Sequence, residues 1–354
     1  MTRRRPLTRW LIALLILHGV IACAGFFAPY DPLEQDRQRP YMSPMRIHIV
    51  DKQGHFHFRP FFYALHLREG SFDQFEADTN TTVPMRFFGR GPRYHLLGLL
   101  PCSLHLFGAE NGRINLLGSD AYGRDQLSRI LYGGQVSLLA GLLGAGLTLF
   151  LGSLVGTTAG YCGGWRDEFL MRVAELFLAL PWLYLLFALR AFLPLAVSPL
   201  EAFLLVVVVT GTVGWARPAR LVRGVVLSVK ERDFVRAARG FGASNAYVLR
   251  RHILPETASV LSTQAAILVP QFVLAEMTLS FLGLGVPEPV PSWGNLLANL
   301  QQYSVLVSYW WMYLPALTIV PFFLAYLGLA NALQEYAEPY KIEGRSDEVR
   351  RESC

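Results

Sequence analysis

The chain has 354 residues, of which 53% are apolar and only 16% are charged, and its formal net charge is +6. The apolar residues cluster in long runs, which is typical of a polytopic membrane protein and excludes an ordinary soluble domain. A basic net charge can indicate nucleic-acid binding. Here the cations lie where apolar runs end, so membrane topology explains them and no nucleic-acid partner is predicted.

The first predicted element, in residues 1–30, is a membrane-spanning helix with a short cytoplasmic N-terminus. Several arginines precede an uncharged run from Trp10 to Tyr30, which is close to the ~20 residues that a span requires. The alternative is a secretory signal, since Ala22-Cys23-Ala24 resembles a small-residue cleavage site. The length of the run favours an uncleaved helix.

Residues 31–130 are predicted to form a small extracytoplasmic insert domain that contains β-structure. Residues 46–50 and 55–58 alternate between polar and apolar around Lys52-Gln53-Gly54, a pattern that predicts a β-hairpin. The arginines of this segment agree with an outside location, because long translocated loops escape the rule that places cations inside.

Six of the eight histidines lie in the insert, and His55 and His57 would share one strand face. A metal site is one interpretation of them. Scattered histidines without neighbouring acids or cysteines are more simply surface side chains, and the four cysteines form no CxxC pair. No metal ligand is therefore predicted.

Residues 131–339 are predicted to hold five more spans and residues 340–354 a cytoplasmic tail. The second span is expected at 136–161, and the third follows a turn at 163–168 and ends at about residue 193. Residues 201–215 begin the fourth span, and the fifth and sixth are expected at 257–284 and 309–333. Gly152, Gly156 and Gly160 lie four apart on one face of the second span, a spacing that lets helices pack closely in lipid. No Gly-Lys-Ser/Thr phosphate loop occurs anywhere, so ATP is not bound by that motif here.

The stretch from 217 to 255 is a basic elbow predicted to lie on the cytoplasmic side. Nine Lys or Arg residues stand against two acids between 217 and 251, an excess that marks a cytoplasmic loop. Asp233 is expected to cap one short helix, Gly240 and Gly242 to allow a turn, and Ser244 to cap a second helix that stops before Pro255. Its small apolar face is predicted to fill a groove on a partner; the face comprises Phe234, Ala237, Ala238 and Phe241.

Glu276 is the one ionisable residue of the fifth predicted span. A carboxylate at membrane depth is costly and rarely faces lipid. It either lines a translocation path or anchors neighbouring helices, and the sequence leaves both interpretations open.

Four motifs in chain order resemble the permease subunits of ABC importers. The resemblance is to the dipeptide, oligopeptide and nickel class, and there to its second, C-type permease. The motifs are Leu117-Gly118-Ser119-Asp120 through Gly123-Arg124-Asp125 and Ser128-Arg129; Arg236-Ala237-Ala238 with Gly242 and Leu254-Pro255; Ala275-Glu276 with Leu279 to Gly285; and Pro291-Ser292-Trp293-Gly294-Asn295. Two positions depart from the family pattern: its Glu is Arg236 here, and its Ile is His252.

The resemblance implies an all-α domain of six transmembrane helices, the type I ABC-importer permease fold, in a bacterial inner membrane. It implies a second permease, two ATPase subunits that bind the ATP, and an extracytoplasmic solute-binding protein; the chain itself would need no cofactor. The resemblance further implies that the basic elbow docks onto an ATPase subunit through the following residues: Phe234, Arg236, Ala237, Ala238, Phe241, Gly242, Leu254 and Pro255.

Two other functions are weaker interpretations. An intramembrane enzyme lacks support, since no span offers paired acids, HExxH or a Ser/His arrangement, and no catalytic residue is predicted. An ion-gradient transporter would use Glu276 as its proton carrier. We therefore expect an importer permease for peptides or a related small solute, and the sequence leaves the solute open.

Overall fold

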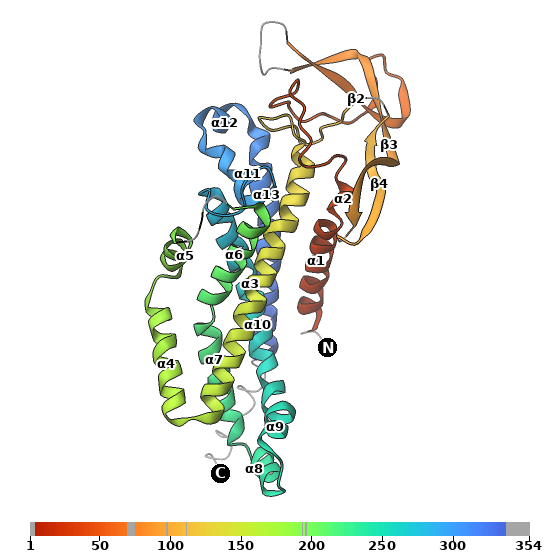
Figure 1. The fold of residues 1–354 in the computed structure, drawn as a ribbon. Coiled ribbons are helices and arrows are strands. Elements are labelled where there is room, and N and C mark those ends of the chain that lie inside the picture. Colours follow the sequence, from red (N-terminus) through yellow and green to blue (C-terminus); the bar gives the residue numbers. More distant parts are fainter. Residues whose placement is uncertain are drawn as a thin grey trace, which may run out of the picture.

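The computed structural model describes residues 4–68, 75–96, 98–110, 112–192, 194 and 197–337. It combines an elongated bundle of helices with a four-stranded sheet at one end of the bundle (Figure 1). Among the described residues, three helical stretches are long and apolar enough to cross a membrane: Gln126–Cys162, Asn245–Phe281 and Trp310–Tyr336. Two bent helix pairs also qualify if each is one span. The count of six spans remains a prediction, and the predicted tail at 340–354 lies outside the described residues.

The predicted first span is divided into two helices. α1 (Arg4–Ala22) is followed by the short α2 (Ala24–Phe27), and the chain becomes extended at Ala28 instead of remaining helical to Tyr30. By length, the apolar part of α1 falls short of a full span. It packs against α13 (Leu314–Ala337).

The β-structure predicted for the insert is present as an antiparallel sheet in the order β1-β2-β3-β4. The strands are β1 (His48–Val50), β2 (Phe56–Leu67), β3 (Phe75–Leu96) and β4 (Leu100–Ala109). The expected hairpin joins β1 to β2, with Gly54 at a φ of +85° in its turn. β3 is long enough to pair with β2 through its first half and with β4 through its second half.

α3 (Gln126–Cys162) is the central helix of the bundle. Asp125 caps it by accepting the Ser128 N–H, which satisfies one of the free donors of the first turn. The predicted glycine face is where α7 (Ala216–Lys230) packs, because a Cβ at Gly156 would collide with the Ala219 carbonyl. This close approach is the small-residue packing expected from the sequence.

The predicted third and fourth spans are bent. α4 (Gly164–Ala179) and α5 (Trp182–Ala191) meet at 89° at Pro181, where the proline cannot continue the hydrogen-bond ladder. α6 (Pro199–Val213) starts with a capping box between Ser198 and Glu201 and meets α7 at 43°.

The rest of the chain alternates short and long helices. α8 (Asp233–Gly240), α9 (Asn245–Val248) and a π-helical turn (Leu249–Ile253) lead into α10 (Leu254–Phe281), which packs against α3 and α13. α11 (Trp293–Ala298), α12 (Tyr303–Ser308) and the flanking 3-10 turns Asn299–Gln301 and Trp310–Tyr313 then connect α10 to α13. α8 and α9 lie at the end of the bundle opposite the sheet (Figure 1).

Candidate functional site

The middle of the basic elbow is a helix–turn–helix, which we define as residues 233–253. Gly242 has a φ of +83°, a conformation that glycine adopts without strain, so it forms the predicted turn. Ser244 caps α9 as predicted, accepting the Tyr247 N–H at 3.3 Å. The prediction for Asp233 is wrong: Arg232 occupies the cap position, and Asp233 is the first helical residue, where its charge still favours the helix N-terminus.

The prediction that the second helix stops before Pro255 is also wrong. The chain remains helical from Asn245 to Phe281 through the π-helical turn. Pro255 lies in the first turn of α10, directly after the π-helical turn, so the chain stays helical past a residue that has no N–H to donate to the preceding turn. The helix–turn–helix is therefore continuous with α10.

A buried apolar cluster holds the helix–turn–helix against the bundle. Val235 of α8, Val248 of α9 and Ile253 of the π-helical turn have no exposed surface, and they pack against valines of α7. The first part of the predicted elbow, residues 217–230, belongs to α7 and lies within the bundle, with Val222 and Val226 also fully buried. Burying this much apolar surface fixes the small unit to α7.

Polar contacts reinforce the connection. Arg223 of α7 donates to both carboxylate oxygens of Asp167 in α4, at 2.5 and 2.7 Å. Lys230 Nζ donates to the Gly160 carbonyl at 3.1 Å. These cations, which the sequence predicts to lie on the cytoplasmic side, connect α3, α4 and α7.

The outward face of the helix–turn–helix carries the predicted coupling residues. Phe241 is 93% exposed and Phe234 is 43% exposed, which is unusual for large aromatic side chains. Ala237, Leu254 and Pro255 are also exposed, and Ala238 is half-buried. Arg236 points to solvent, with its guanidinium 3.1 Å from the Glu231 carboxylate.

His252, at the family's usual isoleucine position, lies between two aromatic rings of this face. Its ring centroid is 5.7 Å from that of Phe234 and 5.8 Å from that of Tyr247. The imidazole thus joins α8 to α9 across the turn. The predicted residues share one end of the molecule, and no described segment covers Phe241.

Glu276 lies in α10 with no exposed surface. Ser280 Oγ donates to its Oε1 at 2.7 Å and accepts the Val286 N–H at 3.1 Å. The hydroxyls of Ser137 and Ser292 are close enough to interact with the carboxyl group, although its Oε2 has no hydrogen-bond partner of good geometry among the described residues. The carboxyl group is therefore enclosed by α3, α10 and the start of α11.

A cluster of four charged side chains lies at the start of α3, at the end of the bundle away from the helix–turn–helix. Arg124 Nε donates to Asp120 Oδ2 at 2.7 Å, and Arg124 Nη1 donates to Glu288 Oε2 at 2.8 Å. Arg129 Nη2 donates to Glu288 Oε1 at 2.8 Å. Asp120, Arg124 and Arg129 are buried, while the Glu288 side chain is 43% exposed. The motif around residue 120 signalled the first three members, and only the fold brings in Glu288.

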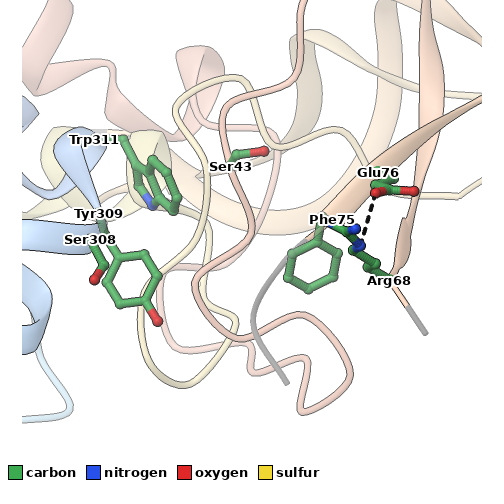
Figure 2. Close-up of a pocket in the computed structure, with 7 residues that line it drawn as sticks. All are labelled: Ser43, Arg68, Phe75, Glu76, Ser308, Tyr309 and Trp311. Atoms are coloured by element: carbon green, nitrogen blue, oxygen red, sulfur yellow. Dashed lines mark ion pairs between the residues drawn. The ribbon is translucent and has the colours of Figure 1, made fainter. Parts of the chain in front are cut away.

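A cavity of about 390 Å³ separates the sheet from the segment before α13 (Figure 2). Arg68 and Glu76, at the facing ends of β2 and β3, form an ion pair of 3.3 Å on one side. Tyr309 and Trp311 line the other side. The Tyr309 ring stacks on Tyr41 with centroids 4.1 Å apart, which fastens the insert to the helical part.

The insert histidines lie closer to an acid than the sequence indicated. His55 Nδ1 and His57 Nε2 are 3.3 and 3.0 Å from the same oxygen of Asp51. The hydrogen bond with His57 lowers the pKa of the half-buried Asp51 carboxyl to about 2. In the described part of the chain, no three His, Cys, Asp or Glu side chains are grouped to hold a metal ion.

Arg190 is a further buried charged residue, and no sequence motif had indicated it. It lies in α5, and its Nε donates to the Leu284 carbonyl at 2.6 Å. Its Nη1 donates to the Pro194 carbonyl at 3.0 Å. The first bond connects α5 to the loop after α10, and both satisfy a charge that would be costly in an apolar setting.

Comparisons with known proteins agree with the membrane character of this arrangement. A family model described as "Binding-protein-dependent transport system inner membrane component" matches residues 152–338. The dipeptide transport system permease protein DppC of Bacillus subtilis (strain 168) is 34% identical over 223 residues, which cover 63% of this chain and 68% of that protein. The oligopeptide transport system permease protein OppC of Haemophilus influenzae is 32% identical over 225 residues, covering 64% and 70%.

Among solved structures, the chain is similar to one of the MetNI methionine ABC transporter in an inward-facing conformation. The TM-score is 0.42 at 15% identity, over 58% of this chain and 96% of that chain. The family match includes the helix–turn–helix and Glu276 and leaves out the sheet.

Proposed function

Because this chain belongs to the family of inner membrane components of binding-protein-dependent transport systems, we propose that it is a permease subunit of an ATP-driven ABC importer. Its relatives' names concern dipeptides and oligopeptides, so the proposed cargo is a peptide or a related small solute. The proposed partners are a second permease, two ATPase subunits on the cytoplasmic face and an extracytoplasmic binding protein.

The observation that carries the proposal is the exposed aromatic face of a firmly anchored helix–turn–helix. Phe241 projects into solvent, while Val235 and Val248 a few residues away have no exposed surface. Because no segment within the described residues covers this apolar face, it indicates a partner with a matching groove. We propose that an ATPase subunit supplies this groove.

Mechanical coupling would follow from the way the unit is attached. The helix–turn–helix packs on α7 through the valine cluster and continues into α10, so a movement of its docked face would displace both helices together. ATP-driven closure of the ATPases would in this way shift the bundle between inward-open and outward-open states. Such coupling requires that the face bind its groove with different free energies in the two states.

For Glu276 the proposed role is a structural anchor. A path formed between two permeases would run along a surface that is exposed in a single chain, and Glu276 is instead enclosed within its own chain. Its bond to Ser280, which also holds the Val286 N–H, supports a role in fixing the loop after α10. The ion-gradient alternative would need this carboxyl group to reach water in one state of the cycle.

The insert is proposed to serve as a docking surface for the binding protein. It lies before the region that the family model matches and forms its own sheet. Its contacts with the segment before α13, through Tyr41 and the cavity of Figure 2, would let a docked protein affect the outer end of the bundle.

The test is uptake by the assembled complex. An affinity-tagged chain would be purified from its native cells with its bound subunits and reconstituted into proteoliposomes, and accumulation of a peptide mixture would be measured by mass spectrometry. We expect uptake that requires ATP and the binding protein and does not occur with a proton gradient alone. Uptake driven by a gradient without ATP would reject the proposal in favour of the ion-gradient transporter.

A further inference from the structure

The hairpin between β3 and β4 ends in an exposed apolar tip. Leu99 is 80% exposed and Leu100 is 63% exposed, and Leu96 pairs with Leu100 across the hairpin. The turn is closed by bonds from the Gly98 N–H to the His95 carbonyl and from the Leu99 N–H to the Leu96 carbonyl. Leu99 and Leu100 thus have outward side chains beside a closed turn, which a water-exposed loop would not favour.

Contacts along the hairpin show which way the tip points. His105 Nδ1 bonds to the Ala28 carbonyl at 2.6 Å, and nearer the tip the Tyr94 ring lies directly against Gly25. Moving toward the tip thus corresponds to moving back along α2 toward α1. Figure 1 shows the lower end of β3 and β4 beside the upper end of α1.

The uncharged run of α1 and α2 sets the level of the tip relative to the membrane. From Trp10 to Ala28 the chain carries no Asp, Glu, Lys or Arg, and at 1.5 Å per helical residue such a run covers nearly the ~30 Å of a hydrocarbon core. Gly25 and Ala28 are at its outer end. The tip extends beyond Tyr94 by at most about 15 Å, so it reaches the level of the outer leaflet.

The side chains of the hairpin change in polarity with distance from the tip, in the same order as the layers of a bilayer. Tyr94, an aromatic residue with a polar hydroxyl, lies at the level of the interface, where such residues concentrate. Arg90 and Arg93, farther from the tip, are exposed, and neither forms an ion pair within the described ranges. They lie where lipid phosphates would meet them.

We propose that the β3–β4 tip inserts Leu99 and Leu100 into the outer leaflet beside α1, with Arg90 and Arg93 at the level of the lipid phosphates. Insertion is limited to the tip, because the free edge of a strand cannot satisfy its backbone groups in hydrocarbon. The contact would hold the sheet at a fixed orientation over the bundle. This inference rests on the membrane location of the chain and is independent of the transported solute.

The test measures the surroundings of single labelled positions in the assembled complex in lipid vesicles. In a background with the four cysteines replaced, Leu99→Cys would carry an environment-sensitive fluorophore. Leu67→Cys is the matched control, since Leu67 is 45% exposed and pairs with the first residue of β3, at the end far from the tip. Quenching by nitroxide on the lipid acyl chains and by aqueous iodide would be compared.

We expect the label at position 99 to emit at shorter wavelength, to lose emission with nitroxide lipid and to resist iodide, and the label at 67 to behave in the opposite way. Leu100→Cys should behave like Leu99→Cys, which guards against a local effect of one label. If positions 99 and 100 are quenched by iodide as strongly as position 67 and are unaffected by nitroxide lipid, the tip lies in water and the proposal fails.

Discussion

Arg129 Nη2 donates to Glu288 Oε1 at 2.8 Å, and this bond joins the first turns of α3 to the loop after α10 across 159 residues of sequence. The Arg129 side chain is fully buried. Its charge is tolerable only because Glu288 and Asp120 lie beside it. The end of the bundle next to the sheet is therefore held by charge pairing as well as by apolar packing.

Glu288→Gln should destabilise the protein. The change leaves two buried guanidinium groups, those of Arg124 and Arg129, with Asp120 as their remaining acidic partner. Since Glu288 is partly exposed, we expect a loss of about 2 kcal/mol, less than for a fully buried pair. Thermal unfolding in nanodiscs measures it. Glu175→Gln, which breaks the exposed pair with Arg172, is the control and should change stability by less than about 1 kcal/mol; equal effects would contradict the cluster's role.

Glu276→Ala should reduce stability while leaving transport per assembled complex intact. Removing the acceptor of Ser280 Oγ leaves a buried hydroxyl unsatisfied and loosens the Val286 N–H, at a cost of about 1–3 kcal/mol. Glu276→Gln keeps an acceptor in place and should cost less. Unchanged stability together with lost transport would instead assign Glu276 to the translocation path.

Gly156→Ala and Gly146→Ala should have opposite effects although both lie in α3. A Cβ at Gly156 would collide with the Ala219 carbonyl of α7, whereas a Cβ at Gly146 meets nothing within 4 Å. We expect a loss of about 1–3 kcal/mol at 156 and a gain of about 0.5–1 kcal/mol at 146 from helix propensity. Equal unfolding temperatures for the two variants would show that α3 and α7 do not need this close approach.

Gly242→Val should weaken attachment of the ATPase subunits. At a φ of +83°, a β-branched residue is strained by about 1–3 kcal/mol, and no neighbouring atom lies within 4 Å of the added Cβ. The effect therefore comes from the backbone alone. Gly242→Asn is the control, because asparagine tolerates this conformation. The amount of ATPase that copurifies should fall for Gly242→Val and be kept for Gly242→Asn. A normal amount of copurified ATPase for both variants would argue against the turn as the coupling element.

Phe241→Ser and Ala238→Asp should leave insertion and folding unchanged and abolish ATP-driven uptake or ATPase binding. Phe241 touches little of its own chain, so its loss affects only an interface, and a charge at Ala238 would be buried unpaired in the groove. Arg236→Glu should be tolerated better, because it only breaks an exposed pair with Glu231. Tyr303→Ser is the matched control, because Tyr303 is 79% exposed in another part of the molecule. Full activity of the two interface variants would disprove the docking face.

Replacing residues 47–112 by a Gly/Ser linker should preserve basal ATP hydrolysis of the complex and reduce its stimulation by loaded binding protein. The cut leaves Tyr41, which stacks on Tyr309, and keeps the hydrogen bonds of Tyr41, Met42 and Met45 to residues 115–120. ATPase assays with and without binding protein measure the effect. Full stimulation would show that the insert is dispensable for docking.

Local patterns were sufficient to predict much of this molecule. Uncharged apolar runs predicted the helices, alternation around Gly54 predicted the first hairpin, and the glycine spacing in α3 predicted a close helix contact. The turn at Gly242 and the cap at Ser244 were predicted because turn formers and caps act over a few neighbouring positions. In each case the controlling physics is local: solvation of a side chain, φ at a glycine, or one face of a helix.

Tertiary structure decided what depends on distant partners. Packing on Gly156 makes residues 217–230 a bundle helix where the basic sequence predicted a loop, and a π-helical turn carries the chain past Pro255 where proline rules predicted a stop. The partner of Arg129 and the enclosure of Glu276 likewise appear only in the folded chain. Burial and charge pairing between segments that are distant in the sequence depend on which surfaces meet, and no local pattern in the sequence records that.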